Sequence, residues 1–235
     1  MIRCITFDLD DTLWDVRPAL ILAEQAQNAW LNTHYPQALA GRSDGDVLSL
    51  KKTVLREDPD LGHNISLFRQ RFIQRLLTDV GVGASEAERA SEGAFAAFID
   101  RRNDVELFPF TDSVLATLGK SYRLGTLTNG NADVFKTPIG HHFEFALQAE
   151  QVGAAKPASA LFDRARELTN LSHHEILHVG DSHDHDVVGA QRAGIDCVWF
   201  TKDGDQSDVA TEVITCLSQL PEVVAELQTR ASTPR

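Results

Sequence analysis

The sequence predicts an α/β protein with a doubly wound parallel sheet and an inserted all-helical domain. After Pro109, short apolar runs of strand character alternate with segments of helical periodicity, and this alternation is typical of a parallel sheet covered by helices. From Arg17 to about Arg102, apolar residues recur at helical spacing without a strand-like run. Because this stretch follows the first strand directly, we expect it at the mouth of the site that such sheets form beyond the carboxyl ends of their strands.

The individual elements follow from the apolar runs and the breaks beside them. The first strand is expected over residues 3–9, where Cys4, Ile5 and Phe7 precede an abrupt acidic end. Further strands are expected at 123–127, 176–179 and 197–200, with weaker ones at 145–147 and 213–216. Helices are expected at 113–118, 158–168, 187–193 and 222–227, and residues 228–235 as a polar, frayed tail.

This order of elements divides the chain into two domains. Residues 1–15 and 106–235 form the predicted Rossmann-like core, and residues 16–105 form the predicted helical cap. Breaks at Pro36, Gly41, 59–62 and 81–83 divide the cap into about four helices.

Composition limits the classes of partner. The chain has 235 residues, and 22 Lys and Arg against 34 Asp and Glu give a formal net charge of −12, which argues against a sequence-independent grip on nucleic acid. No apolar run approaches the ~18 residues of a membrane span, and Met1 leads directly into a strand-like run instead of a signal peptide. Cys4, Cys197 and Cys216 lie far apart in apolar surroundings, which indicates reduced thiols and a cytoplasmic protein. The sequence leaves the oligomeric state open, a monomer included.

Polar clusters occur where the predicted strands end. Residues 8–12 (Asp-Leu-Asp-Asp-Thr) follow the first strand, residues 128–130 (Thr-Asn-Gly) follow the second, and residues 180–182 (Gly-Asp-Ser) follow a later one with Asp186 close behind. Lys156 stands just ahead of a helix start. The first cluster alone is a weak signal. Four polar groups in register with strand ends are a strong one, because the carboxyl ends of parallel strands meet at one edge of the sheet.

The carboxylates in these clusters predict a metal. Asp8, Asp10, Asp181 and Asp186 would place four negative charges in one pocket, and this repulsion requires a counter-ion. Carboxylate and carbonyl oxygens are ligands of Mg²⁺, which commonly binds beside a substrate phosphate. With Mg²⁺ and Lys156 the pocket would still carry a slight negative charge, so one carboxyl group crowded by like charges would keep a proton and serve as a general acid.

These residues resemble the haloacid dehalogenase superfamily of aspartate-nucleophile hydrolases, in the form that carries a helical cap after the first strand. The resemblance covers essentially the whole chain. It implies that Asp8 is the nucleophile that forms an aspartyl-phosphate, and that Asp10 protonates the leaving alkoxide and then activates the hydrolytic water. Superfamily members that cleave carbon–halogen bonds lack the second aspartate, so Asp10 favours a phosphatase over a dehalogenase.

The same resemblance implies roles for the other polar residues. Thr128 and the backbone N–H groups of Asn129 and Gly130 would hold phosphate oxygens, and Leu9 would contribute to the same subsite. Lys156 would neutralise phosphate and orient Asp8. The metal ligands would be Asp8, Asp10, Asp181 and Asp186. His185 occupies the position just before Asp186 where the superfamily often has Asn, so this chain departs from the superfamily there and lacks the amide that could donate a hydrogen bond.

At a finer level, several segments are similar to bacterial phosphatases that act on FMN and on the phosphorylated ribitylamino-uracil precursor of riboflavin. The segments are 7–15 with Arg17-Pro18, 128–132, 142–145 and 176–181. Trp14 and Arg17 open the cap segment, where a flat ring could stack and a phosphate or ring carbonyl be bonded. The alternative for these two residues is a hinge packed in the core.

Other functions stay open at this point. A broad-specificity sugar-phosphate or nucleotide phosphatase would carry the same catalytic residues. A phosphoryl-accepting receiver domain also has an acidic Mg²⁺ site with Thr and Lys, but in a shorter chain and in a different order. A catalytically inactive binding module is the third alternative. Finally, seven of the nine histidines lie between His141 and His185, which would suit a transition metal, but no third soft ligand stands at metal-binding spacing.

Overall fold

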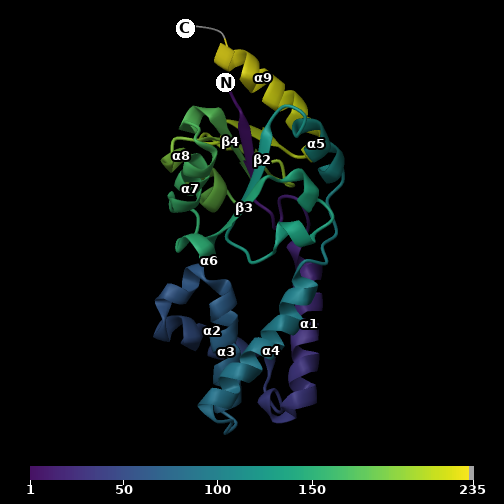
Figure 1. Ribbon diagram of the computed structural model, residues 1–235, viewed down its shortest axis with the longest axis vertical. Helices are drawn as coiled ribbons and strands as arrows, with labels where there is room; N and C mark the ends of the chain where they lie inside the picture. Colours follow the sequence, from purple (N-terminus) through teal and green to yellow (C-terminus); the bar gives the residue numbers. More distant parts are fainter. Residues whose placement is uncertain (233–235) are drawn as a thin grey trace. The chain divides into compact units, whose positions relative to one another are not determined.

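The computed structural model describes residues 1–232, which separate into two compact units. One unit combines Met1–Val16 with the chain from Val105 onward, and the other is Arg17–Asp104 (Figure 1). No helix of the described chain is long and apolar enough to cross a membrane.

The first unit contains a six-stranded sheet in the order β3-β2-β1-β4-β5-β6, and all of its neighbouring strands are parallel. The fold class predicted from the sequence is therefore confirmed. This is the doubly wound strand order, in which the direction of winding reverses between β1 and β4. Phe7 pairs with Thr126 on one side and Val179 on the other, so the carboxyl ends of the three strands align. The strands are β1 (Cys4–Phe7), β2 (Arg123–Thr128), β3 (Phe145–Gln148), β4 (Ile176–Gly180), β5 (Asp196–Phe200) and β6 (Glu212–Ile214).

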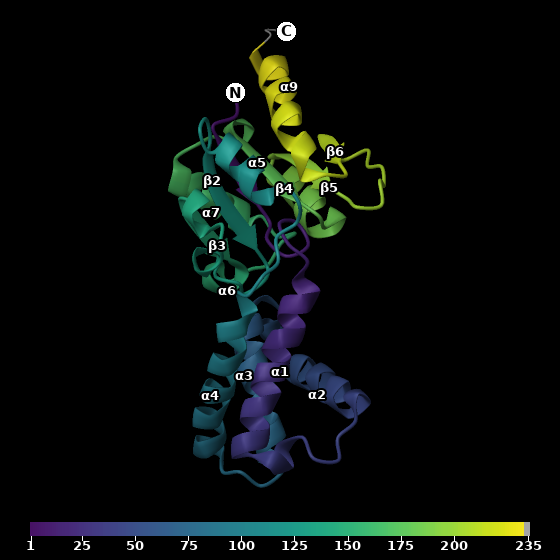
Figure 2. The same ribbon diagram turned by 90° about the vertical axis from the view of Figure 1, so that its right-hand side faces the viewer.

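Helices cover both faces of this sheet (Figures 1 and 2). Side chains alternate across a strand, so Ile5 and Phe7 of β1 pack on one layer and Cys4 on the other. The layer around Ile5 includes α5 (Thr111–Leu118) and α9 (Leu220–Ser232), and the layer around Cys4 includes α7 (Ala160–Thr169) and α8 (Val188–Arg192). The short helix α6 (Ala149–Val152) follows β3.

The expected frayed tail is wrong as far as Ser232, because α9 extends to that residue. The side-chain amide of Gln228 explains why: it donates to the backbone carbonyl of Ile2 at 2.8 Å and accepts from the N–H of Ile2 at 2.7 Å. These two hydrogen bonds attach the last helix to Ile2, two residues before β1 begins. Residues 233–235 of the expected tail lie outside the described chain.

The second unit is built from four helices, and the described residues of this unit contain no strand. They are α1 (Val16–His34), α2 (Asp44–Glu57), α3 (Ile65–Thr78) and α4 (Ala84–Arg102). A buried cluster joins Leu31 of α1 to Phe72 and Leu76 of α3 and Ala90 of α4. Ser43 and Asp46 form a capping box at the start of α2, which satisfies N–H groups that the helix leaves unpaired.

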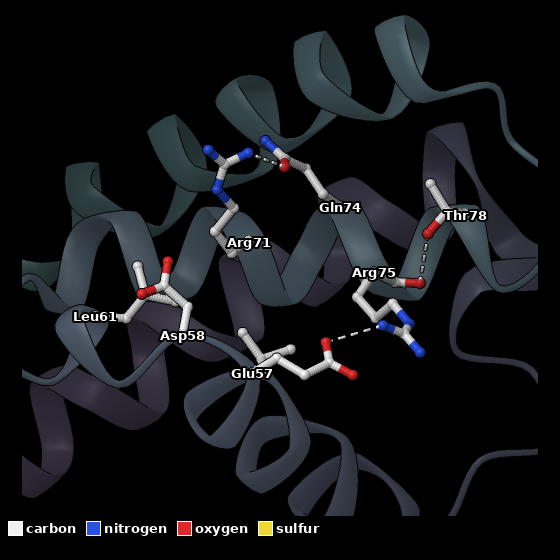
Figure 3. A pocket seen from close by; sticks show the side chains of 8 residues that line it. Glu57, Asp58, Leu61, Arg71, Gln74, Arg75 and Thr78 are labelled. Carbon is white, nitrogen blue, oxygen red and sulfur yellow. Dashed lines mark hydrogen bonds and ion pairs between the residues drawn. The ribbon is translucent and has the colours of Figure 1, made fainter.

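This helical unit has a surface pocket of about 300 Å³ beside α3 (Figure 3). Arg71 donates to the side chain of Gln74 at 2.9 Å, and Arg75 pairs with Glu57 at 3.2 Å. Asp58 also lines the pocket. Two cationic and two anionic side chains line the pocket, so it offers no surplus positive charge to a phosphate.

Candidate active site

The acidic segment after β1 turns sharply at the edge of the sheet. The N–H of Asp8 still donates to the carbonyl of Val179 on β4, at 2.9 Å, so Asp8 continues the backbone hydrogen bonding between β1 and β4. Asp11 then adopts a left-handed conformation, with φ of 61°, and its carboxylate accepts from the N–H of Val16. Asp tolerates this conformation better than most residues. Asp11 therefore shapes the turn that leads away from Asp8.

Asp8 and Asp10 line one small cavity at the carboxyl edge of the strands. The cavity has a volume of about 120 Å³, and its other lining residues are Thr128, Asn129, Gly130, Lys156, Ser182, His185 and Asp186. These residues come from the ends of β1, β2 and β4 and from the loop before α7. The structure thus brings together most of the residues singled out in the sequence.

Lys156 is the centre of the site. Its buried ammonium donates to Asp8 at 2.7 Å, to Asp186 at 2.6 Å and to the backbone carbonyl of Leu127 at 2.6 Å. The side chain of Asn129 holds the backbone of Lys156 from both sides, since its amide donates to the carbonyl and its oxygen accepts from the N–H. Asn129 therefore positions Lys156, a role that the sequence did not indicate.

The end of β4 delivers the remaining carboxylates. Asp186 lies in a π-helical turn, His183–Val187, and its carboxylate accepts from the N–H of Ser182 at 3.0 Å. A side chain on Gly180 would approach Asp186 to 2.2 Å, so only glycine fits there. Asp181 accepts from the hydroxyl of Thr12 at 2.9 Å, which ties the acidic ends of β1 and β4 together.

His178 is a residue of this site that the sequence analysis did not single out. It is fully buried on β4, with one ring nitrogen 3.0 Å from Asp186 and the other 3.0 Å from the hydroxyl of Thr6. Burial lowers its pKa, which favours the neutral ring despite the carboxylate beside it. A polar residue in the middle of an apolar strand is the signal that would have revealed it.

The charges of the site are unevenly compensated. Burial raises the pKa of Asp8 above its ordinary value, although the ammonium of Lys156 opposes this. Burial and the charge of Asp186 raise the pKa of Asp181 to about 6. Burial acts on Asp186 as well, but Lys156 and His178 outweigh it and lower the pKa of Asp186. Lys156 and Asp186 thus form a charged pair, and the other two carboxylates repel further negative charge.

A divalent cation fits this arrangement. Carboxylate oxygens of Asp8, Asp181 and Asp186 lie within 4.8 Å of one another. Three carboxylates against one ammonium leave an excess of negative charge, and an all-oxygen donor set suits Mg²⁺. The carboxylate of Asp10 does not belong to this group. Its oxygen accepts instead from the indole N–H of Trp14 at 2.9 Å.

The predicted phosphate-binding residues lie at the ends of β1 and β2. The N–H of Gly130 donates to the hydroxyl of Thr128 at 2.9 Å, so both groups are held at the edge of the cavity. Leu9 has its side chain in the apolar core, so only its backbone can serve a ligand.

The two ring-binding candidates differ from the expectation. Trp14 is fully buried in the core of the first unit, so it has no open face for a substrate ring, and its observed contact is with Asp10. Its burial agrees with the part of the alternative that packs this residue in the core. Arg17 is an exposed residue in the first turn of α1 and belongs to the helical unit. Its role as a substrate contact stays a prediction.

The doubly wound sheet thus has two aspartates in contact with a buried lysine at the carboxyl edge of its strands. The chain belongs to the haloacid dehalogenase-like hydrolase family, whose model matches residues 2–194. It is therefore an enzyme.

Curated relatives of this chain are phosphatases. Over 199 residues it is 35% identical to the 5-amino-6-(5-phospho-D-ribitylamino)uracil phosphatase YigB of Escherichia coli, covering 85% of this chain and 83% of YigB. Over 141 residues it is 36% identical to a phosphoserine phosphatase of Thermus thermophilus, covering 57% of this chain and 55% of that enzyme. The resemblance seen in the sequence to riboflavin-precursor phosphatases is confirmed by the first match.

A solved structure described as a 2-haloacid dehalogenase from Pseudomonas syringae is also very similar. It is 38% identical, has a TM-score of 0.89, and the match covers 96% of this chain and 99% of that one. Proteins similar to this chain are therefore named both as phosphatases and as a dehalogenase. Since one fold can support both reactions, the choice between them has to rest on the residues of the site.

Proposed function

We propose that this protein is a Mg²⁺-dependent phosphomonoester hydrolase that acts through an aspartyl-phosphate on Asp8. The observation that carries the proposal is the pair Asp8 and Asp10, which line one cavity with Thr128 and Lys156. A nucleophile, a proton donor and phosphate-binding groups then share a single site.

In the first step a carboxylate oxygen of Asp8 attacks phosphorus, and the bond between phosphorus and the ester oxygen breaks. Asp10 transfers its proton to the departing alkoxide, while the N–H of Trp14 fixes the orientation of the Asp10 carboxyl group. Lys156 holds Asp8 through its 2.7 Å hydrogen bond and offsets the charge of the phosphoryl group. Mg²⁺ held by Asp8, Asp181 and Asp186 would neutralise the phosphoryl oxygens further.

In the second step the aspartyl-phosphate is hydrolysed. Asp10, now a carboxylate, accepts a proton from water as the water oxygen attacks phosphorus. The bond between phosphorus and Asp8 breaks, which releases inorganic phosphate and restores both aspartates. Most of the acceleration comes from positioning and charge neutralisation, because the protein's covalent contribution is confined to the nucleophile.

Asp10 is also what argues against a dehalogenase. A halide departs from carbon without a proton, so that reaction has no use for an acid beside the nucleophile. Here the carboxyl group lies in the same cavity as Asp8 and is oriented by Trp14. For this reason the name of the phosphatase relatives fits this chain better than the name of the similar structure from Pseudomonas syringae.

The substrate we propose is a small phosphorylated metabolite, with FMN and the phosphorylated ribitylamino-uracil as the first candidates. The support is the match to YigB, which extends over most of both chains. A broader sugar-phosphate or nucleotide phosphatase is the alternative, because other relatives carry such names, among them a pyrimidine 5'-nucleotidase of Escherichia coli.

The test is a kinetic screen with two product assays. Phosphate release is measured with Mg²⁺ for FMN, the ribitylamino-uracil phosphate, sugar phosphates and nucleotides, and chloride release is measured for 2-chloropropionate. We expect kcat/KM above about 10⁴ M⁻¹s⁻¹ for at least one phosphomonoester, no chloride, and loss of activity with EDTA that Mg²⁺ reverses. Chloride without phosphate would make the protein a dehalogenase, and neither product would favour a binding module.

A further inference from the structure

A second group of metal-ligating side chains lies in the first unit and shares no residue with the catalytic cavity. Asp112 stands in the first turn of α5, and His141 and His142 end the short 3₁₀ helix Gly140–His142. One ring nitrogen of each histidine and one carboxylate oxygen of Asp112 lie within 4.8 Å of one another. The cluster is hidden in the sequence because the rest of α5, strand β2 and a further loop lie between Asp112 and the two histidines.

The two histidine rings are already oriented. The Nδ1–H of His141 donates to the carbonyl of Pro138 at 3.1 Å, which leaves Nε2 with the lone pair in the neutral ring. Histidines that bind metals commonly have their other nitrogen fixed in this way by a carbonyl or carboxylate. The Nε2 of His142 lies 2.8 Å from a carboxylate oxygen of Asp112, so the two atoms share one proton in a hydrogen bond. A metal ion bound by both atoms would take the place of that proton.

Only small movements would close the cluster on one ion. Ligand atoms bound to a tetrahedral Zn²⁺ lie about 3.3 Å apart, given bond lengths near 2.0 to 2.2 Å. Asp112 is 64% exposed, and His141 also lies at the surface. The side chain of His142 is only 12% exposed and serves as the fixed member. Asp112 is far more exposed than His142 and therefore has more room to adjust its position around an ion.

We propose that Asp112, His141 and His142 form a binding site for a divalent transition metal such as Zn²⁺. Two imidazoles with one carboxylate suit Zn²⁺, Cu²⁺ or Ni²⁺ and not Mg²⁺, which prefers oxygen ligands. The ion would join the start of α5 to the segment that follows the Thr128–Gly130 loop. It would bind the folded state selectively and thereby stabilise the first unit.

The experiment is a Zn²⁺ titration by calorimetry on the untagged full chain in saturating Mg²⁺, which keeps the carboxylate site of Asp8 filled. We expect one equivalent of Zn²⁺ to bind and Tm to rise with its concentration. Asp112→Asn and His141→Asn should each weaken Zn²⁺ binding at least about tenfold and abolish the rise in Tm. Both positions are exposed, and Tm without metal shows whether each variant is folded.

The chain supplies a matched control in His173 and His174, a second pair of adjacent histidines in a 3₁₀ helix outside any three-ligand cluster of the described residues. Replacing both with Asn should leave Zn²⁺ affinity unchanged. An Asp181→Asn variant should also retain the Zn²⁺ site, because that substitution affects only the catalytic carboxylates. Equal Zn²⁺ affinity in wild type and in the Asp112→Asn, His141→Asn double variant would overturn the proposal, and so would absence of saturable binding.

Discussion

Lys156 holds together two carboxylates that would otherwise repel each other. Its side chain is 1% exposed, and its ammonium lies 2.7 Å from Asp8 and 2.6 Å from Asp186. The two carboxylates raise the pKa of Lys156 despite its burial, so the residue stays charged. Removal of one member of such a buried group leaves the others uncompensated, which costs more than the group's net contribution to stability.

We therefore predict that Lys156→Met lowers the free energy of unfolding by about 3 kcal/mol in metal-free buffer. Mg²⁺ should restore part of this loss, because the ion replaces the missing positive charge beside the carboxylates. Urea unfolding with and without Mg²⁺ measures both effects. The control is Lys136→Met, because the Lys136 side chain is 66% exposed and its ammonium forms a long ion pair with Asp133, at 3.9 Å. We expect this substitution to change the free energy of unfolding by no more than about 0.5 kcal/mol. Equal stability of Lys156→Met and wild type would contradict the prediction.

Asp10→Asn should show its effect through the leaving group. An alkoxide needs a proton and a nitrophenolate does not, so the first step should slow far more for an alkyl phosphate than for an aryl phosphate. Water activation in the second step should slow for both substrates, so the aspartyl-phosphate accumulates. Pre-steady-state kinetics would then record a burst of nitrophenolate followed by slow turnover. Equal first-step losses with no burst would mean that another group supplies the proton.

Individual catalytic candidates were predictable because their residue types stand at strand ends or, for Lys156, just ahead of a helix start. Asp8, Asp10, Thr128 and Lys156 line one cavity, as the pattern of polar clusters suggested. Contacts between such residues were not predictable, because they depend on register and rotamer. Two such features are the hydrogen bonds from the Asn129 side chain to the backbone of Lys156 and the burial of Trp14.

At the scale of elements, β4 connects the catalytic edge to the core through His178. The ring lies between Thr6 of β1 and Asp186, and Phe162 of α7 packs edge-on against it with ring centroids 5.1 Å apart. Partners that orient a metal ligand commonly change metal affinity when they are removed. We therefore expect His178 to be a positioning residue that acts through Asp186.

His178→Phe should raise the Mg²⁺ concentration for half-maximal activity at least about tenfold, with a smaller change in substrate KM at saturating Mg²⁺. His178→Gln keeps a donor that can reach Asp186 and should recover part of the Mg²⁺ affinity. Activity titrations with Mg²⁺ at fixed substrate measure this. If the His178→Phe variant has a lower Tm but the same Mg²⁺ concentration for half-maximal activity as wild type, His178 contributes to packing only.

The expected strands are all present, with ends that shift by up to two residues, because short apolar runs between turn residues are strong signals. The segment before α8 was harder to predict. Residues 183–187 form a π-helical turn in which Ser182 caps the N–H of His185. Its sequence is polar and has no helical periodicity, so its conformation depends on the hydrogen bonds that hold Asp186.

At the scale of the whole molecule, the doubly wound order explains why distant segments share one site. The strand order places β1 between β2 and β4, so the ends of these three strands face the same edge. Alternation of strands and helices predicted a doubly wound parallel sheet, since parallel neighbours need crossover helices, but not its strand order. Alternation alone could not show that Asp112 approaches His141 and His142, because loops set that geometry.

The most direct test of the proposed chemistry is the turnover of Asp8→Asn with a phosphomonoester that the wild type hydrolyses in Mg²⁺. An amide of similar size cannot attack phosphorus, so the variant should fold and bind substrate but lose kcat by at least about a thousandfold. Phosphate release measures kcat, and substrate binding and Tm measured on the same sample show that the variant is folded and binds its substrate. Residual kcat within tenfold of wild type would show that Asp8 is not the nucleophile.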